Sequence, residues 1–287
     1  MPSLCLKYQA PLAWGALLAF LALRCPMTVG RREGSAYVQA INLAGTAGWV
    51  RVDPVAGAAL AVQYSSSLQA HVAALEARLR VLFDLDTDPR PIDAQLRFDA
   101  LIGGDVLRTP GLRVPGSVDD FALVLRTLLG QQISVQRATV LYGQFAQRFG
   151  VAVAGPDGSR LHTPALASRV AQATVEEIGL IGMPRRRAAT IHTLARLFAT
   201  GELQLSRDAD TPALRERLDA IPGIGDWTLQ YLAMRGLRDA DAFPAGDLGV
   251  KQALQVKTPG QAQRAAERWR PWRAYAVMHL WCRPHGA

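Results

Sequence analysis

One carboxylate is placed where it could act in catalysis. Asp247 follows Gly246 and opens a stretch of helical character, Leu248-Gly249-Val250-Lys251. An Asp in this position is first of all an N-cap, which accepts hydrogen bonds from the first-turn amides of a helix. The same position keeps a carboxylate ionised and rigid, which suits the stabilisation of a developing cation. The sequence therefore predicts an N-cap at Asp247 that is also a candidate catalytic group.

A glycine-rich turn upstream could bind phosphate. One helix is expected to end at Leu218-Asp219-Ala220, and a second to begin at Asp226, after Ile221-Pro222-Gly223-Ile224-Gly225. The glycines permit a tight chain reversal, and the second helix presents backbone N–H groups to an anion. Such a hairpin binds one DNA strand through its backbone without reading sequence. An ordinary helix–turn–helix corner remains the alternative, because this short motif alone is weak evidence.

The composition fits a globular protein that binds a polyanion. The chain has 287 residues, 49% of them hydrophobic, and a formal net charge of +8. Basic proteins are attracted to nucleic acid, although membrane surfaces attract them too. The three cysteines (Cys5, Cys25 and Cys282) lie far apart, which argues against a disulfide framework, a zinc site and an iron–sulfur cluster. A reducing cytoplasm is the expected location.

The N-terminal apolar segment has two interpretations. Residues 10–23 are apolar without a break, with Lys7 before them and Arg24 after. The segment is too short to span a bilayer, and a signal-peptide cleavage site is lacking after it. We therefore expect a buried helix over 14–23, with Pro11 in its first turn.

The remaining elements predict an α+β fold that is mainly α. Strand-like segments cover residues 37–43, 49–52 and 60–64, with Gly45, Gly48, Pro54 and Gly57 as turns. A helix is expected through 68–82, and residues 150–160 read as a glycine-rich loop. The Ser117-Val118-Asp119-Asp120 segment has capping-box spacing before a helix. Further helices are expected at 135–149, 164–171, 186–200 and 212–218.

An ordered set of motifs resembles the helix-hairpin-helix superfamily of DNA glycosylases, and within it the 3-methyladenine type II enzymes. The resemblance covers nearly the whole chain. Its motifs are Arg113-Val114-Pro115-Gly116, Leu129-Gly130-Gln131-Gln132-Ile133-Ser134, Gly182-Met183-Pro184, the 221–231 hairpin, Gly246-Asp247, the 266–276 segment and His279-Leu280-Trp281. It implies an N-terminal α/β domain with an antiparallel sheet (residues 1–90), a C-terminal helical domain (91–116 with 236–287) and a helix-hairpin-helix domain (117–235).

The resemblance also implies roles for individual residues. Asp247 would stabilise the oxocarbenium-like sugar and orient water at C1′. The aromatic base pocket would comprise Trp227, Tyr231, Trp281 and Phe20. A cationic alkylated purine would be attracted to those rings, which would also replace the stacking that the base loses on leaving the duplex. For a single aromatic residue, core packing is the ordinary explanation.

DNA contacts are expected at the hairpin and at one loop. Gly223 and Gly225 would bind phosphate, while Gln131 and Gln132 lie between two helices. Gln132 matches the wedge that fills the space left by the flipped base, and the alternative for it is a polar surface loop. The run from Arg185 to Arg187 at a helix start is more often simply solvated.

The resemblance does not fix the substrate range, nor whether a cation binds at the hairpin. Leu248 departs from the family pattern, where an aromatic residue is familiar, so the pocket shape is not fixed. No cofactor is expected, although hairpin carbonyls near Asp219, Ile221 and Ile224 could hold a monovalent cation.

The expected function is excision of alkylated bases from double-stranded DNA by hydrolysis of the N-glycosidic bond, in base excision repair. The protein is expected to act as a monomer in the cytoplasm, associated with the nucleoid. Lyase chemistry is not expected, because Trp227 occupies the position of the lysine that lyase-competent relatives use. The alternatives are a non-catalytic helix-hairpin-helix DNA-binding protein and a glycosylase for oxidised or mismatched bases.

Overall fold

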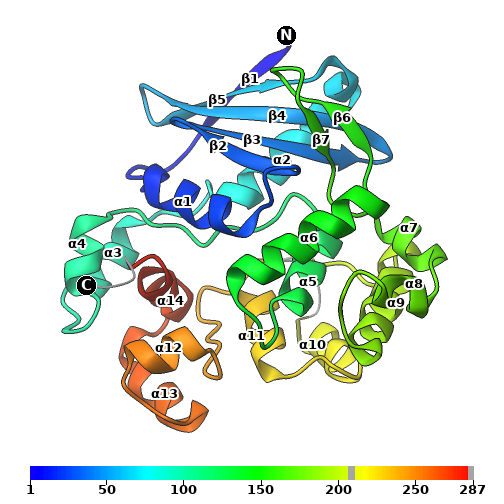
Figure 1. Cartoon of the computed structure of the whole chain (residues 1–287). Helices are drawn as coiled ribbons and strands as arrows, with labels where there is room; N and C mark the ends of the chain where they lie inside the picture. Colours follow the sequence, from blue (N-terminus) through cyan, green and yellow to red (C-terminus); the bar gives the residue numbers. More distant parts are fainter. Residues whose placement is uncertain (206–210, 284–287) are drawn as a thin grey trace. The chain divides into compact units, whose positions relative to one another are not determined.

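The computed structural model describes residues 1–205 and 211–283, and this part of the chain forms two compact units (Figure 1). The first contains residues 1–7, 18–82 and 117–205. The second contains 8–17, 83–116 and 211–283 of the described residues. The hairpin and its two flanking helices, within residues 211–235, are thus grouped by contacts with the C-terminal helices. The three-domain division expected from the sequence remains a prediction.

The first unit contains a five-stranded antiparallel sheet in the order β1-β5-β4-β3-β2. The strands are β1 (Ser3–Lys7), β2 (Gly30–Glu33), β3 (Ala36–Leu43), β4 (Thr46–Val55) and β5 (Ala59–Tyr64). The antiparallel sheet expected at the N-terminus is confirmed, with β1 and β2 as additions. Gly45 (φ 87°) and Gly57 (φ 81°) lie in turns as expected. Gly48 and Pro54 do not, because both are paired within β4.

A second short hairpin packs on this sheet (Figure 1). The strands β6 (Ala152–Ala154) and β7 (Arg160–His162) pair where the sequence indicated a loop. Their apolar residues Val153 and Leu161 join a buried cluster with Val38 and Trp49 of the sheet. The prediction of a loop was wrong because three-residue strands are too short to show alternation, so that burial against β3 and β4 decides their structure.

Helices complete the first unit. They are η1 (Ser66–His71), α2 (Val72–Phe83), α5 (Asp120–Leu129), α6 (Val135–Phe149), α7 (Ala167–Gln172), α8 (Val175–Gly179) and α9 (Arg185–Ala199). The helix expected through 68–82 is divided into a 3-10 turn and α2. The expected capping box is also wrong: Asp119, not Ser117, is the N-cap of α5, and its carboxylate accepts the Ala122 amide at 2.6 Å.

The second unit is helical in its described part. It comprises α3 (Arg90–Leu96), α4 (Gly103–Arg108), α10 (Thr211–Asp219), α11 (Asp226–Arg235), α12 (Leu248–Ala253), α13 (Pro259–Ala266), η2 (Glu267–Trp269) and α14 (Arg273–Trp281). Trp269 is fully buried and meets Phe243 edge to face, with ring centroids 6.3 Å apart. The core of this unit therefore lies beside the segment that leads to Asp247.

The apolar segment near the N-terminus is the helix α1 (Trp14–Arg24), and the division between the units falls within it, after Leu17. The helix is confirmed, but Pro11 lies before it and not in its first turn. Within the two described ranges, no helix combines the length and the apolar character needed to cross a membrane.

Candidate active site

Asp247 is the N-cap of α12 and lies half-buried at the centre of a hydrogen-bonded group. Its Oδ1 accepts the Val250 amide at 3.0 Å and the indole N–H of Trp281 at 3.1 Å. Its Oδ2 accepts the indole N–H of Trp227 at 3.0 Å. Three N–H donors fix the orientation of this carboxylate. The predicted N-cap is confirmed, and two tryptophans predicted from the family pattern hold the same carboxylate.

The predicted aromatic residues of this unit lie in a row, with each ring tilted against the next. The centroids of Trp227 and Tyr231 are 5.3 Å apart, and those of Tyr231 and Trp281 are 5.7 Å apart, with interplanar angles of 34° and 37°. Trp227 and Tyr231 are one helical turn apart on α11, and Trp281 is the last residue of α14. The row forms because three different elements, α11, α12 and α14, meet at Asp247.

Arg235 is a supporting residue that sequence reasoning missed. It is buried, and its Nη1 donates to the phenol oxygen of Tyr231 at 2.7 Å. Its other nitrogens donate to the carbonyls of Pro115 at 2.7 Å and Gly116 at 2.9 Å. A buried guanidinium requires such partners, so the Pro-Gly pair has a physical role here. The four-residue spacing of Tyr231 and Arg235 on one helix was the available signal.

Gly249 is a second residue that the sequence analysis passed over. A Cβ atom at this position would lie 3.3 Å from Asp247 Oδ1 and 3.8 Å from the Trp281 ring. The first of these distances is tighter than an ordinary van der Waals contact, so a side chain there would disturb the carboxylate. The glycine therefore leaves room beside Asp247 Oδ1.

Phe20 belongs to the first unit, whereas the other predicted pocket residues belong to the second. Its side chain is 3% exposed, and the Arg24 guanidinium lies 3.7 Å from the ring centroid. The ring is thus a buried aromatic with a cation on one face. Its place in the base pocket remains a prediction.

The predicted hairpin is present between α10 and α11. Gly223 has a φ of 98°, in the left-handed region that glycine tolerates best, and the Ile224 amide donates to the Ile221 carbonyl at 3.0 Å. Gly225 is the N-cap of α11 with a φ of −116°. Its backbone is extended, and an added Cβ would meet no atom within 4 Å. Of these two glycines, Gly223 is the one whose backbone conformation requires glycine.

Gln131 and Gln132 lie between α5 and α6 in the first unit. Gln132 is exposed and has a φ of 60°, unusual for a residue other than glycine. Gln131 is half-buried, and its carbonyl accepts a hydrogen bond from Arg187 Nη2 at 2.9 Å. Leu248, the residue that departs from the family pattern, is 66% exposed after Asp247.

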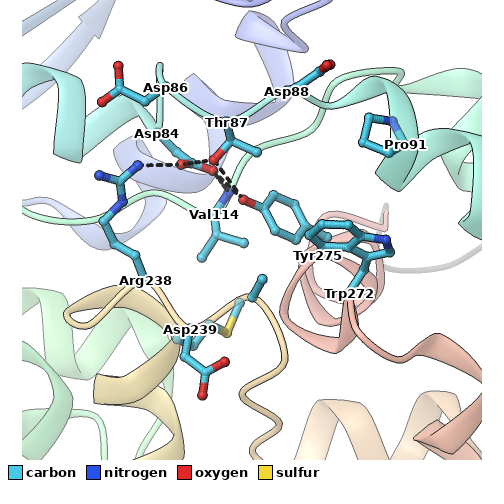
Figure 2. Close-up of a pocket in the computed structure, with 12 residues that line it drawn as sticks. Asp84, Asp86, Thr87, Asp88, Pro91, Val114, Arg238, Asp239, Trp272 and Tyr275 are labelled. Carbon is cyan, nitrogen blue, oxygen red and sulfur yellow. Dashed lines mark hydrogen bonds and ion pairs between the residues drawn. The ribbon is translucent and has the colours of Figure 1, made fainter. Parts of the chain in front are cut away.

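A cavity of about 260 Å³ elsewhere in the second unit contains none of the predicted site residues. Figure 2 shows Arg238 and Tyr275 pointing toward the buried Asp84. The Tyr275 hydroxyl donates to this carboxylate at 2.8 Å, and Arg238 lies 3.2 Å from it. Burial, together with the negative charge of Asp84, raises the pKa of Tyr275 above its usual range. The mutual pairing of these groups makes the cavity wall a satisfied structural network.

The comparisons with known proteins agree with this arrangement. Residues 3–119 match the AlkA N-terminal domain, and residues 125–273 match the HhH-GPD superfamily base excision DNA repair protein model. The chain is 34% identical to DNA-3-methyladenine glycosylase 2 of Escherichia coli K12 over 96% of this chain and 95% of that protein.

Two solved structures share the fold. The 3-methyladenine DNA-glycosylase from Archaeoglobus fulgidus has a TM-score of 0.84 at 23% identity, over 98% of this chain and 97% of that one. An 8-oxoguanine glycosylase/lyase of Clostridium acetobutylicum has a TM-score of 0.75 at 15% identity, over 98% and 96%. The same fold thus occurs in a glycosylase and in a glycosylase/lyase. Together with the family matches, the fold shows that the chain belongs to the HhH-GPD superfamily of base excision DNA repair proteins.

Proposed function

We propose that this protein, a DNA glycosylase of base excision repair, is monofunctional and removes alkylated bases of the 3-methyladenine type. The observation that carries the proposal is the Asp247 carboxylate, held by two indole N–H groups beside the row of rings of Trp227, Tyr231 and Trp281. This arrangement unites an anion for a developing sugar cation with a platform for a flipped base.

The proposed reaction is hydrolysis at C1′ of the damaged nucleotide. The N-glycosidic bond breaks and its electron pair leaves with the base nitrogen, which neutralises the positive charge of an alkylated purine. Asp247 stabilises the cationic sugar and orients a water molecule. The water oxygen forms the new bond to C1′, and its proton passes to solvent. Because the base leaves uncharged, the reaction does not require a general acid.

Recognition of the base rests on charge and stacking. A cationic purine is attracted to the faces of aromatic rings, and the half-buried Trp227 and Trp281 flank the buried Tyr231. Arg235 lies behind Tyr231 and fixes its hydroxyl. We propose that Phe20 contributes a further aromatic surface. The exposed Leu248 would leave the rim less enclosed than an aromatic residue would.

DNA binding is proposed to use both units. In the hairpin, the N-terminus of α11 carries the positive end of the helix dipole, which favours an anion. Gly225, with open space at its Cβ position, permits a phosphate to approach the backbone. Gln132 would act as the wedge. The protein is proposed to bind alkylated double-stranded DNA as a monomer, and its nucleoid association in the cytoplasm remains a prediction.

A monovalent cation at the hairpin remains a proposal as well. The candidate ligands are the carbonyls of Asp219, Ile221 and Ile224. The Ile221 carbonyl accepts the Ile224 amide at 3.0 Å, and its second lone pair could still bind a cation. The cation would supply positive charge close to the DNA phosphate.

The lyase alternative is disfavoured by the group at the nucleophile position. A lyase needs an amine that forms a Schiff base with the sugar, whereas Trp227 offers an indole N–H that donates to Asp247. The fold does not discriminate here, because a glycosylase/lyase shares it.

The test is borohydride reduction during turnover on a duplex with one alkylated purine. We expect abasic sites, strand breaks only after alkali, and no covalent adduct. Stoichiometric trapping of protein on DNA would show that a lysine, with Lys251 in α12 as the first candidate, supplies an amine. The monofunctional assignment would then be wrong.

A further inference from the structure

The loop that carries the proposed wedge is fixed at both of its ends within the first unit. At its start, the Gln131 amide donates to the Leu128 carbonyl at 3.3 Å, which continues the last turn of α5. At its end, Ser134 caps α6 by accepting the Arg137 amide at 3.2 Å. Gln132 lies between these points, exposed and in the left-handed region. A residue other than glycine keeps this conformation only where the surroundings impose it.

Arg187 donates a hydrogen bond to the peptide group that directly precedes the Gln132 Cα atom. Its Nη2 donates to the carbonyl oxygen of Gln131 at 2.9 Å. That carbonyl belongs to the planar peptide group that also contains the Gln132 nitrogen. The Gln132 Cα atom lies in the same plane. When the plane is held in place, the position of this Cα atom is held as well. The hydrogen bond therefore restrains the direction in which the Gln132 side chain leaves the loop.

The donor itself is firmly held. Arg187 lies in the first turn of α9 and is half-buried. The same helix buries Ala188, Ile191, Leu194 and Ala195, and it contacts α5, α7 and α8. Its neighbours Arg185 and Arg186 are exposed, and Arg185 forms an exposed ion pair with Glu176 at 2.9 Å. The three arginines that the sequence presents as one charged run thus have different environments.

We propose that Arg187 is a positioning residue for base flipping, which holds the Gln131–Gln132 peptide so that the Gln132 side chain can enter the DNA. The proposal rests on the proposed function, in which Gln132 fills the space of the flipped base. Arg187 acts through Gln132 and not on the reacting atoms. Its loss should therefore weaken the step that extracts the base, and it should leave the hydrolytic step intact.

The test compares two substrates and two matched variants of the full-length protein. One duplex carries a single 7-methylguanine paired with cytosine. The other carries the same base in an unpaired loop, where extraction is already accomplished. Arg187→Met keeps the aliphatic stem and removes the guanidinium, and Arg186→Met removes the same charge from the exposed neighbour. Single-turnover excision is measured at saturating enzyme.

We expect Arg187→Met to slow excision from the paired duplex about tenfold relative to Arg186→Met. This is the effect expected when one hydrogen bond from a charged donor is lost. On the looped substrate the two variants should agree within about twofold. In a Gln132→Ala background, Arg187→Met should cause no further loss, because both changes remove one function. If Arg187→Met does not fold, Arg187→Lys, which keeps the charge without the planar fork, replaces it in the same comparison.

Two results would overturn the positioning role. Equal effects of Arg187→Met and Arg186→Met would show that charge alone matters, and equal slowing on both substrates would indicate a general defect. Asp247→Asn, measured in parallel, separates this outcome from failure of the proposed function. If Asp247→Asn loses excision on both substrates, the catalytic assignment stands whatever Arg187 does. If it retains excision, that assignment fails, and the comparison of substrates still tests Arg187.

Discussion

Replacement of Asp247 by Asn tests the catalytic assignment by exchanging one carboxylate oxygen for an amide NH2 group. Asn keeps one side-chain oxygen, so it can still cap α12 and accept the Trp281 indole, as Oδ1 does at 3.0 Å and 3.1 Å. Its amide nitrogen would replace Oδ2 and face the Trp227 indole N–H, which now lies 3.0 Å away. Two donors would then oppose each other, so we expect a loss of about 1–3 kcal/mol in the free energy of unfolding.

The effect on rate should exceed the effect on stability. A carboxylate about 4 Å from a developing cation contributes roughly 4 kcal/mol at an effective dielectric constant of about 20. Loss of that contribution slows the reaction roughly a thousandfold. DNA affinity should change little, because phosphate contacts dominate it and Asp247 lies in the proposed base pocket.

The assay is single-turnover excision from a duplex with one alkylated purine, with abasic sites revealed by alkali. Trp227→Phe is the matched control, since it removes the same hydrogen bond and keeps an aromatic ring and the carboxylate. We expect this control to lose about tenfold or less. If Asp247→Asn were no slower than Trp227→Phe, the lost hydrogen bond would explain the whole effect. The carboxylate charge would then have no catalytic role.

Two further predictions concern the hairpin and a buried histidine. Gly223→Val should weaken DNA binding and lower the melting temperature, because Val disfavours the φ of 98°. Gly225→Ala should leave the melting temperature unchanged, because its Cβ would meet no atom within 4 Å. Salt titrations of affinity check this, and a wild-type affinity indifferent to salt would contradict phosphate binding. Burial lowers the pKa of His279 from 6.5 to about 4, so the unfolded chain binds more protons between these values. The contribution of His279 to the free energy of unfolding is thus complete above pH 6.5. It is lost as the pH falls toward 4, by up to about 3 kcal/mol. Burial raises the pKa of Asp119 to about 6, and this shift increases the free energy of unfolding as the pH falls, which opposes the effect of His279. The measurement is therefore the difference in the free energy of urea unfolding between wild type and His279→Leu at each pH. Parallel pH profiles of the two proteins would refute the prediction.

The local features of the site could be predicted from residue types. A glycine followed by Asp247 indicated a helix N-cap, and the hairpin glycines indicated a chain reversal, because capping and backbone freedom depend on near neighbours. Both predictions are confirmed. The family pattern added the aromatic residues, three of which meet in one unit. It did not indicate that two of them donate to the same carboxylate.

Features that depend on distant partners were decided by the tertiary structure. The strands β6 and β7 form because their few apolar side chains are buried against the sheet, and no period in the sequence marks them. Which of the two hairpin glycines needs the left-handed region followed from how α10 and α11 are joined. Arg235 could not be assigned before its carbonyl partners, Pro115 and Gly116, were brought beside it.

The sequence by itself determined which groups are available: one capping carboxylate, a glycine hairpin, a row of aromatic residues and a run of arginines. Only the tertiary structure decided that Trp281 and Trp227 fix Asp247, and that Arg187 donates to the loop between α5 and α6. The physical reason is range. Capping and turn formation act between neighbours along the chain, whereas hydrogen bonds between α11, α12 and α14, or between α9 and the α5–α6 loop, exist only after each unit has folded.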